Sequence, residues 1–458
     1  MQDIPGTIAK MRAYFETGKT KDVDFRLEHL RKFLASLKAH EEDFYEAMKA
    51  DFNKPKFESY ATEISLVYGE IENKLKHLKK WTKPKRKSVG LSSWPSYGKE
   101  IPEPYGLVLV MAPWNYPYML TLAPVVGALA AGNCVLIKPS NRSPHTSDVI
   151  KTVCDEVFEE GYVDVVLGGR QENQALLEQK FDFIFFTGGV SVGTMVLEKA
   201  AVHLTPCILE LGGKSPVFVE EDCDLKTTVR RLVWGKYTNA GQTCVCPDYI
   251  LVNEKIHDEF LEAVKAQIKE FYYDGDTISD DFPHLITDSH YEKVTSLVDE
   301  DKVVFGGKKD ASKRLLEPTI EDNVVLEDKI MSEEIFGPVM PILKVKDIEE
   351  AVSIAKKVNG GAKPLALYIF TNDKEKVKYV HNEISFGGGC VNDTLMHVAT
   401  EDLPFGGVGN SGMGFYHGKR TFDAFTHYKG VVFKGKMDIP LRYPRYTEKK
   451  FNTIKKLL

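Results

Sequence analysis

The cysteines of this 458-residue sequence offer neither a disulfide framework nor a zinc site. There are seven, an odd number, scattered from Cys134 to Cys390. Cys244 and Cys246 form only a C-x-C pattern, without a second pair or a histidine cluster at zinc spacing. We therefore expect no structural metal. Because disulfides belong to oxidising compartments, we also expect a cytoplasmic location.

A strong charge of one sign and long apolar runs are missing as well. The 60 basic and 66 acidic residues give a net charge of −6 with no long basic run, so nucleic acid is not an expected partner. The N-terminus shows no basic segment followed by an apolar one, as a secretory signal would. The most apolar stretch, residues 120–137, is interrupted by proline, glycine and asparagine, which predicts a buried helix, a turn and a strand. We expect no integral membrane segment.

Helical and alternating patterns divide the chain into parts. Residues 7–82 have the period of amphipathic helices, and residues 83–104 form a connecting arm rich in Lys, Ser, Pro and Gly. Strands and helices then alternate, which predicts a parallel sheet covered on both faces. Its strands are expected at 107–111, 135–137, 163–167 and 181–186. A second α/β set is expected from Leu209 to about Cys390, with strands near 217, 250, 303, 342 and 367 and helices near 255–271 and 347–358.

A glycine-rich turn follows the strand expected at 181–186. It reads Thr187-Gly188-Gly189-Val190-Ser191-Val192-Gly193, and we expect a helix from 194 to 203. Such a turn can cradle a dinucleotide phosphate, although the spacing is not G-x-G-x-x-G. Residues 189–193 also match the G-x-S-x-G pattern of a serine hydrolase. The turn alone leaves both interpretations open, but the hydrolase leaves Cys244 unexplained and lacks an upstream oxyanion loop.

Cys244 is the strongest candidate nucleophile. It follows an expected helix at 224–237 and lies among Gly, Gln, Thr and Pro, which are poor core material, so we expect a reachable thiol rather than a buried packing cysteine. Glu210, between two leucines, is expected to be desolvated and to act as a base, unless it pairs with a lysine. Asn115 follows the first strand at its carboxyl end, where it can donate to an oxyanion or cap a turn.

Seven segments in order resemble the NAD(P)-dependent aldehyde dehydrogenase superfamily. They are Pro-Trp-Asn-Tyr-Pro (113–117), Lys-Pro-Ser (138–140), Phe-Thr-Gly (186–188), Leu-Glu-Leu-Gly-Gly-Lys-Ser-Pro (209–216), Gly-Gln-Thr-Cys (241–244), Glu-Glu-Ile-Phe-Gly-Pro-Val (333–339) and Pro-Phe-Gly-Gly-Val-Gly-Asn-Ser-Gly (404–412). The short N-terminus and the ending near residues 439–446 look most like the dimeric class 3 branch, which oxidises aromatic and medium- to long-chain aldehydes.

The resemblance implies a fold and a mechanism. The fold is α/β, with two Rossmann-like parallel-sheet domains and a small bridging sheet that builds a homodimer. The implied parts are an NAD(P)-binding domain (1–82 and 105–207), a catalytic domain (208–400), and a bridging arm with a C-terminal segment (83–104 and 401–458). Cys244 would attack the aldehyde, with Asn115 holding the oxyanion. Glu210 or Glu333 would activate the water that hydrolyses the thioester. NAD, NADP or both would be held by Trp114, Lys138, Ser140, Asn141, Thr187, Gly188, Gly193, Glu334 and Phe336.

Two points stay open at the level of the sequence. A CoA-acylating dehydrogenase would use the same cysteine, but it needs no hydrolytic base, so Glu210 argues against it. The family commonly has a glutamate after Lys-Pro-Ser that favours the free 2′-hydroxyl of NAD, and this chain has Asn141 instead. We therefore predict that both NAD and NADP are used.

Overall fold

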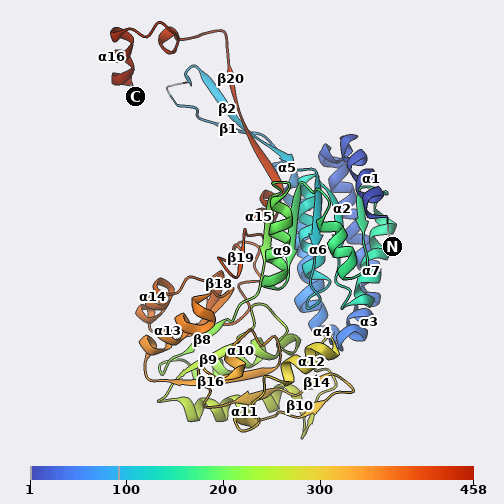
Figure 1. Cartoon of the computed structure of the whole chain (residues 1–458), viewed down its shortest axis with the longest axis vertical. Coiled ribbons are helices and arrows are strands. Elements are labelled where there is room, and N and C mark those ends of the chain that lie inside the picture. The colour runs from blue at the N-terminus through green and yellow to red at the C-terminus, as the bar shows by residue number, and fades with distance from the viewer. Residues whose placement is uncertain (1–2, 91–92, 458) are drawn as a thin grey trace.

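A computed structural model describes residues 3–90 and 93–457, and its first α/β unit is built on a six-stranded sheet (Figure 1). The strand order is β19-β7-β6-β3-β4-β5, and all neighbours are parallel except β19 with β7. The bounds are β3 Leu107–Met111, β4 Cys134–Lys138, β5 Val163–Val165, β6 Phe183–Thr187, β7 Cys207–Glu210 and β19 Gly412–Met413. The expected parallel sheet is confirmed. Its strands are almost wholly buried because helices cover both faces.

Those helices come mainly from the N-terminal region and from the crossovers between strands. They are α1 Ile4–Glu16, α2 Val23–Ala39, α3 Glu41–Phe52, α4 Lys56–Ser59, α5 Ser65–Trp81, α6 Met119–Ala131, α7 Pro144–Val157, α8 Arg170–Leu177, α9 Val190–Ala201 and α15 Lys419–Ala424, with a π-helical turn at Tyr60–Ile64 between α4 and α5. The buried helix α6, a turn at Gly132 and strand β4 confirm the expectation for residues 120–137. Of the residues described, none belongs to a helix with both the length and the apolar character needed to cross a bilayer.

The second α/β unit has a seven-stranded sheet in the order β12-β15-β16-β9-β8-β17-β18. Its strands are β8 Pro216–Val219, β9 Tyr249–Asn253, β12 Val303–Phe305, β15 Thr319–Glu321, β16 Val339–Val345, β17 Ala366–Phe370 and β18 Gly388–Val391. Its helices are α10 Leu225–Tyr237, α11 His257–Tyr272, α12 Asp288–Thr295, α13 Ile348–Lys357 and α14 Lys374–Glu383. Two small hairpins pair β10 Tyr273–Asp274 with β11 Thr277–Ile278, and β13 Lys309–Asp310 with β14 Leu315–Leu316.

The expectation that the second set of strands begins at Leu209 is wrong. Strand β7, which ends in Glu210, pairs with β6 and so belongs to the first sheet. The error has a physical cause, because an isolated run of four residues carries no signal for which sheet it joins. The second set begins at β8, and Glu210 reaches the site from the first unit.

A third sheet extends away from the first unit together with the C-terminal helix α16, Glu448–Leu457 (Figure 1). It joins β1 Lys85–Lys87, β2 Ser96–Pro104 and β20 Thr426–Lys434 in antiparallel order. The arm expected at 83–104 is thus an antiparallel ribbon, as the small bridging sheet requires. Residues 412–424 instead lie with the first unit, since β19 joins its sheet and α15 packs on α6.

Candidate active site

The carboxyl ends of β3, β6 and β7 open into a cavity of about 780 Å³ that the second unit closes from the other side. Most of the side chains predicted from the sequence line it, namely Trp114, Asn115, Thr187, Gly188, Glu210, Cys244, Glu333, Glu334 and Phe336. Ligands bind at this edge of parallel sheets because the strand order and the loops leave a crevice there. The cavity is large enough for a dinucleotide-sized ligand.

A second cavity, of about 200 Å³, lies on the other side of Cys244. Cys244 and Leu120 line both cavities. The remaining lining of the smaller cavity is mostly apolar and includes Leu66, Tyr116, Met119, Trp234, Leu395, Met396, Val398, Phe405 and Tyr416. The thiol therefore lies between a larger cavity that contains several charged side chains and a smaller, mostly apolar one.

The loop that carries Cys244 is buried, contrary to the expectation from its composition. Helix α10 is capped by Asp224 and ends at Tyr237, as expected, but Asn239 and Gln242 are then completely buried. Most of their polar side-chain groups are hydrogen-bonded, although the Asn239 Oδ1 has no partner. The Gln242 side chain donates to the carbonyls of Asn239 and His284 (both 3.1 Å) and accepts from the Ile286 N–H (3.0 Å). A polar loop can be core material when most of its donors and acceptors are paired.

Cys244 itself is partly accessible, and its environment favours the thiol over the thiolate. Burial raises the pKa of Cys244 well above its usual range, and the nearby carboxylates of Glu334 and Glu210 add to the effect. A base must therefore take the thiol proton when the nucleophile attacks. Cys246 is buried and its Sγ lies 3.4 Å from the Lys236 carbonyl, and it lines neither cavity.

Glu210 is the buried carboxylate of the site. Its side chain is only 2% exposed, and neither carboxyl oxygen has a hydrogen-bond partner. Burial raises the pKa of Glu210 well above its usual range. The lysine ion pair that was the alternative from the sequence is not found among the described contacts of this residue. An unpaired carboxyl that lines the same cavity as a thiol is suited to accept a proton from water.

Two adjacent glutamates are held in different environments. Glu333 is half exposed and its carboxylate pairs with Lys293 at 2.6 Å. Glu334 is less exposed, one of its oxygens lacks a partner, and burial raises its pKa to about 8. Their segment is fixed by a buried ion pair between Lys214 and Asp248 (2.5 Å). The Lys214 ammonium also donates to the carbonyls of Ile330 and Glu333, and the Asp248 carboxylate accepts the Ile335 N–H.

Asn115 reaches the nucleophile loop directly. Its side-chain amide donates to the Gln242 carbonyl at 3.0 Å, and the residue is 3% exposed. An amide group has two N–H donors, so one is free to serve an oxyanion beside Cys244.

An aromatic wall closes the cavity near Glu334. The rings of Trp114 and Phe336 lie edge to face with their centres 5.4 Å apart, and the His290 ring lies against both. The His290 imidazole donates through Nε2 to the Phe336 carbonyl at 2.8 Å. Burial lowers the pKa of His290 to about 4, so the ring is neutral at physiological pH. The wall is therefore uncharged and suits a flat ring.

The other predicted cofactor residues lie outside the lining of this cavity. Lys138 ends strand β4, is buried, and donates to the Pro139 carbonyl at 2.7 Å, while burial lowers its pKa to about 8. The Ser140 hydroxyl accepts the Arg142 N–H at 3.2 Å. Asn141 is exposed and its amide lies against Gly169. Glu172, which accepts the Gly169 N–H at 2.7 Å, interacts electrostatically with Lys138.

The glycine-rich turn has the geometry of an anion cradle rather than a nucleophile elbow. Helix α9 begins at Val190, four residues earlier than expected, so Ser191 is exposed in the first helical turn and not at the strand–helix turn. Gly189 has open space where a side chain would be, and the buried Thr187 hydroxyl has no partner. Gly193 lines neither of the two cavities; it lets α9 pack against Leu211, where a Cβ would lie 2.5 Å from the leucine side chain.

Sequence comparison assigns the family. The model of the aldehyde dehydrogenase family matches residues 1–431. The chain belongs to the aldehyde dehydrogenase family. It is 44% identical to 4,4′-diaponeurosporen-aldehyde dehydrogenase of Staphylococcus aureus, over 97% of this chain and 96% of that one. It is 41% identical to the dimeric NADP-preferring aldehyde dehydrogenase of Rattus norvegicus, over 97% and 98%. A substrate-bound Staphylococcus aureus AldH structure superposes with a TM-score of 0.96, at 44% identity over 100% and 99% of the two chains.

Membership of the aldehyde dehydrogenase family resolves the alternatives left by the glycine turn. The chain is an NAD(P)-dependent aldehyde dehydrogenase, an oxidoreductase that converts aldehydes into acids. The class 3 resemblance is confirmed, because relatives over nearly the whole chain are family 3 members. Within the described part of the chain, no group of three or more His, Cys, Asp or Glu side chains could hold a metal ion.

Sequence reasoning missed the residues that hold the site together. Lys214 and Asp248 fix the Glu333–Phe336 segment, and the Tyr116 hydroxyl lies 2.6 Å from that of Thr243, next to the nucleophile. Glu58, from the N-terminal helices, accepts the Asn239 N–H at 2.8 Å. Lys214, Tyr116 and Thr243 lie inside motifs and could have been singled out. Glu58 lies in no motif, so only the fold brings it to the site.

Proposed function

We propose that the aldehyde binds in the smaller, apolar cavity, that Cys244 attacks its carbonyl carbon there, and that the larger cavity holds the cofactor. The observation that carries this proposal is the position of Cys244 in the lining of both cavities. The thiol proton passes to water, which can reach the partly accessible Cys244, the sulfur–carbon bond forms, and the carbonyl π electrons move to oxygen. The free N–H of the Asn115 amide and the Cys244 N–H stabilise this oxyanion.

Glu210 is the proposed base for the second half of the reaction. Once the thiohemiacetal has been oxidised to a thioester, Glu210 removes a proton from water, whose oxygen attacks the thioester carbon and displaces the Cys244 sulfur. The burial and the unpaired oxygens of Glu210 support this role. Glu333 is the second candidate for this base, but its ion pair with Lys293 makes its carboxylate less available to accept a proton from water. Hydrolysis yields the carboxylic acid.

The residues around the larger cavity fit a nicotinamide dinucleotide. When bound, this cofactor supplies the two-electron acceptor for the oxidation of the thiohemiacetal. The unpartnered Thr187 hydroxyl and the free N–H groups at the start of α9 suit its pyrophosphate. The unpartnered Glu334 oxygen suits a ribose hydroxyl, and Phe336 and Trp114 suit the nicotinamide ring. Lys138, Ser140 and Asn141 would lie on the adenosine side, beyond the cavity.

The apolar cavity supports medium- to long-chain aliphatic or aromatic aldehydes as substrates. Its lining offers aromatic and aliphatic side chains, and burying one methylene contributes about 0.8 kcal/mol. Among relatives, the staphylococcal enzyme acts, by its name, on a 4,4′-diaponeurosporen aldehyde, a substrate consistent with an apolar chamber.

A homodimer assembled through the β1–β2–β20 sheet is also proposed. The name of the rat relative describes a dimer, and β20 presents exposed Val431 and Val432 on the protruding sheet. A reducing, cytoplasmic setting is supported by the seven cysteines, all of which are free.

A panel of aldehydes from acetaldehyde to decanal and benzaldehyde, followed by NADH or NADPH absorbance, tests the substrate proposal. We expect kcat/KM to rise with chain length. A preference for acetaldehyde would contradict it. Adding CoA should not change the rate or the product; formation of an acyl-CoA would favour the CoA-acylating alternative.

A further inference from the structure

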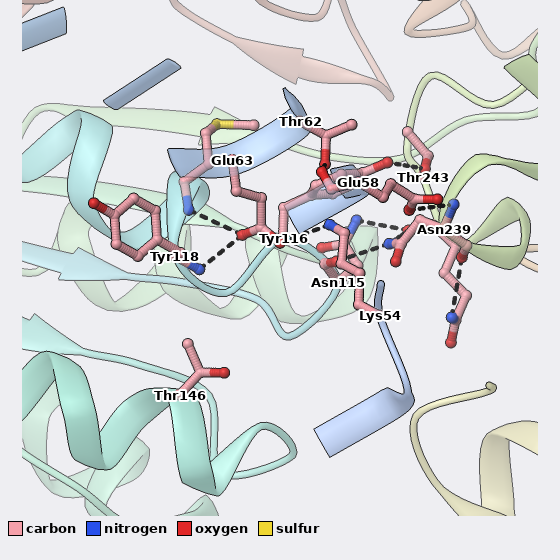
Figure 2. A network of polar contacts seen from close by, with 12 residues as sticks. Lys54, Glu58, Thr62, Glu63, Asn115, Tyr116, Tyr118, Thr146, Asn239 and Thr243 are labelled. Atoms are coloured by element: carbon pink, nitrogen blue, oxygen red, sulfur yellow. Dashed lines mark hydrogen bonds and ion pairs between the residues drawn. The ribbon is translucent and has the colours of Figure 1, made fainter. Parts of the chain in front are cut away.

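Glu58 joins the N-terminal helices to the nucleophile loop of the second unit. It lies in the short helix α4, and its Oε1 accepts the backbone N–H of Asn239 at 2.8 Å (Figure 2). The contact spans 181 residues of sequence and crosses the boundary between the two units. In the reaction proposed above, Glu58 does not contact the substrate.

The hydrogen bond with Glu58 stabilises an unusual backbone conformation at Asn239. Asn239 and Ala240 both have left-handed backbone conformations, with φ of 55° and 51°. Two consecutive residues of this kind are strained, because the Cβ atom crowds the backbone, although asparagine tolerates the conformation better than alanine. Such a conformation persists only when the surrounding contacts hold it. The Glu58 hydrogen bond is one of those contacts.

Asn239 also connects the loop to the oxyanion donor. Its side-chain amide donates to the Asn115 carbonyl at 2.8 Å (Figure 2). It also donates to the Gln242 carbonyl at 3.3 Å. The Asn115 side chain in turn donates to the same Gln242 carbonyl. Asn239 therefore links the carboxylate of Glu58 to Asn115 and to Gln242, which lies two residues before Cys244.

The carboxylate of Glu58 stays available for this hydrogen bond because its neighbours are bound to other groups. Lys54, which acts on Glu58 electrostatically, forms a fully buried ion pair with Glu63 at 2.6 Å. The Lys54 ammonium also lies 4.2 Å from the centre of the Tyr116 ring. Burial raises the pKa of Glu58 to about 7, and both its charged and its neutral forms have an oxygen that can accept the N–H.

We propose that Glu58 is a positioning residue, which fixes the left-handed turn at Asn239 and thereby aligns Cys244 with the Asn115 amide. The inference rests on the proposed function of Cys244. Positioning the turn requires a hydrogen-bond acceptor on a side chain as long as that of glutamate. A negative charge is not required.

Three variants of Glu58 separate the effect of side-chain length from the effect of side-chain charge. Glu58→Gln keeps an acceptor oxygen at the same reach, Glu58→Asp keeps the charge but is one methylene shorter, and Glu58→Ala has neither. We expect Glu58→Gln to retain kcat/KM for the aldehyde within about threefold. Glu58→Asp and Glu58→Ala should lose about 10- to 100-fold, since a misplacement of about 1 Å can cost that much. A charge-dependent role would reverse the order of Gln and Asp, and that result would overturn the proposal.

Glu321 offers a matched control. It is a buried glutamate that, like the half-buried Glu58, accepts a backbone N–H, that of Asp299 at 2.9 Å, and burial raises its pKa to about 7 as well, but it lines neither cavity. Glu321→Ala should lower the melting temperature yet leave kcat/KM per folded molecule unchanged. If Glu321→Ala and Glu58→Ala affect kcat/KM equally, Glu58 is merely structural.

The alkylation rate of Cys244 by iodoacetamide gives a readout that does not depend on the aldehyde. Glu58→Ala should change this rate at least tenfold while the dissociation constant for NADP changes less than threefold. Turnover of aldehyde by Cys244→Ala would refute the proposed function and leave this measurement on Glu58 interpretable. An unchanged alkylation rate in Glu58→Ala and Glu58→Asp would refute the positioning role.

Discussion

Replacing Glu210 by glutamine tests the assignment of the hydrolytic base. The amide keeps the size of the side chain but cannot take a proton from water. Hydride transfer does not need that proton acceptor, so the variant should accumulate the thioester. We expect a rapid burst of one NADH per active site followed by slow turnover.

The size of the effect follows from the environment of the carboxyl group. General-base catalysis contributes roughly 10²- to 10⁴-fold, which corresponds to about 3–5 kcal/mol of barrier at about 1.36 kcal/mol per tenfold. Without the Glu210 carboxylate to accept its proton, water should attack the thioester only slowly. We therefore expect steady-state kcat to fall by at least about 100-fold.

The pH dependence has a definite sign. Burial raises the pKa of Glu210, and a general base acts only when deprotonated, so hydrolysis should speed up as the pH rises through this raised pKa.

The same pKa shift affects stability. The folded protein keeps the Glu210 proton at a pH where the unfolded chain has released it. Stability is therefore lost as the pH rises above the ordinary glutamate value, and Glu210→Gln should remove that loss.

Stopped-flow absorbance at 340 nm between pH 6 and 9 measures both phases, and Glu333→Gln is the matched control. Glu333 lines the same cavity but is half exposed and paired with Lys293. Its variant should show no burst and less than a threefold change in turnover. Near-normal turnover of Glu210→Gln without a burst, together with a burst in Glu333→Gln, would refute the assignment and transfer the role to Glu333.

Four further outcomes are expected. Cys244→Ala should abolish aldehyde oxidation while NADP binding, measured by fluorescence titration, changes less than threefold; measurable turnover would contradict the mechanism. Asn141→Glu should depress kcat/KM for NADP about tenfold and spare NAD, because a carboxylate repels the 2′-phosphate; an equal response of both cofactors would show that this position does not sense it. Lys54→Met should lower the free energy of unfolding by about 3–5 kcal/mol in urea titrations, since Glu63 would be a buried carboxylate without its cation, held only by the Tyr118 and Met119 N–H groups; a loss below 1 kcal/mol would contradict this. In an n-alkanal series kcat/KM should rise up to about fourfold per methylene until the apolar cavity is full, and a flat series would argue against substrate binding there.

The regular parts of the fold could be predicted because their signals are local. Strands such as Leu107–Met111 are continuous apolar runs, and helices such as His257–Tyr272 carry a clear amphipathic period. The partner of a strand is not a local property, so the short β7 was assigned to the wrong sheet. Residues of the candidate site were found where a polar group stood out at the end of a strand, as Asn115 and Glu210 do.

The support of the site could not be predicted, because its contacts span large sequence separations. Glu58 meets Asn239 across 181 residues, and Lys214 reaches Ile330 across 116. Neither Glu58 nor Lys54 differs in its sequence surroundings from the many solvated charges of the N-terminal helices. The pairing of Lys54 with Glu63 in the core depends on the π-helical turn at Tyr60–Ile64, which has no pattern of its own.

The polar composition around Cys244, which argued for an exposed loop, instead explains why the buried loop has one conformation. An apolar loop would pack with little directional preference, whereas each buried amide restricts the backbone to arrangements that satisfy its hydrogen bonds. The Gln242 side chain alone is bound by Asn239, His284 and Ile286, and leaving one such group unpaired costs about 1–3 kcal/mol. That cost disfavours every alternative backbone conformation of residues 239–243. The loop can therefore hold left-handed residues next to the nucleophile, and Cys244 is placed before any substrate arrives.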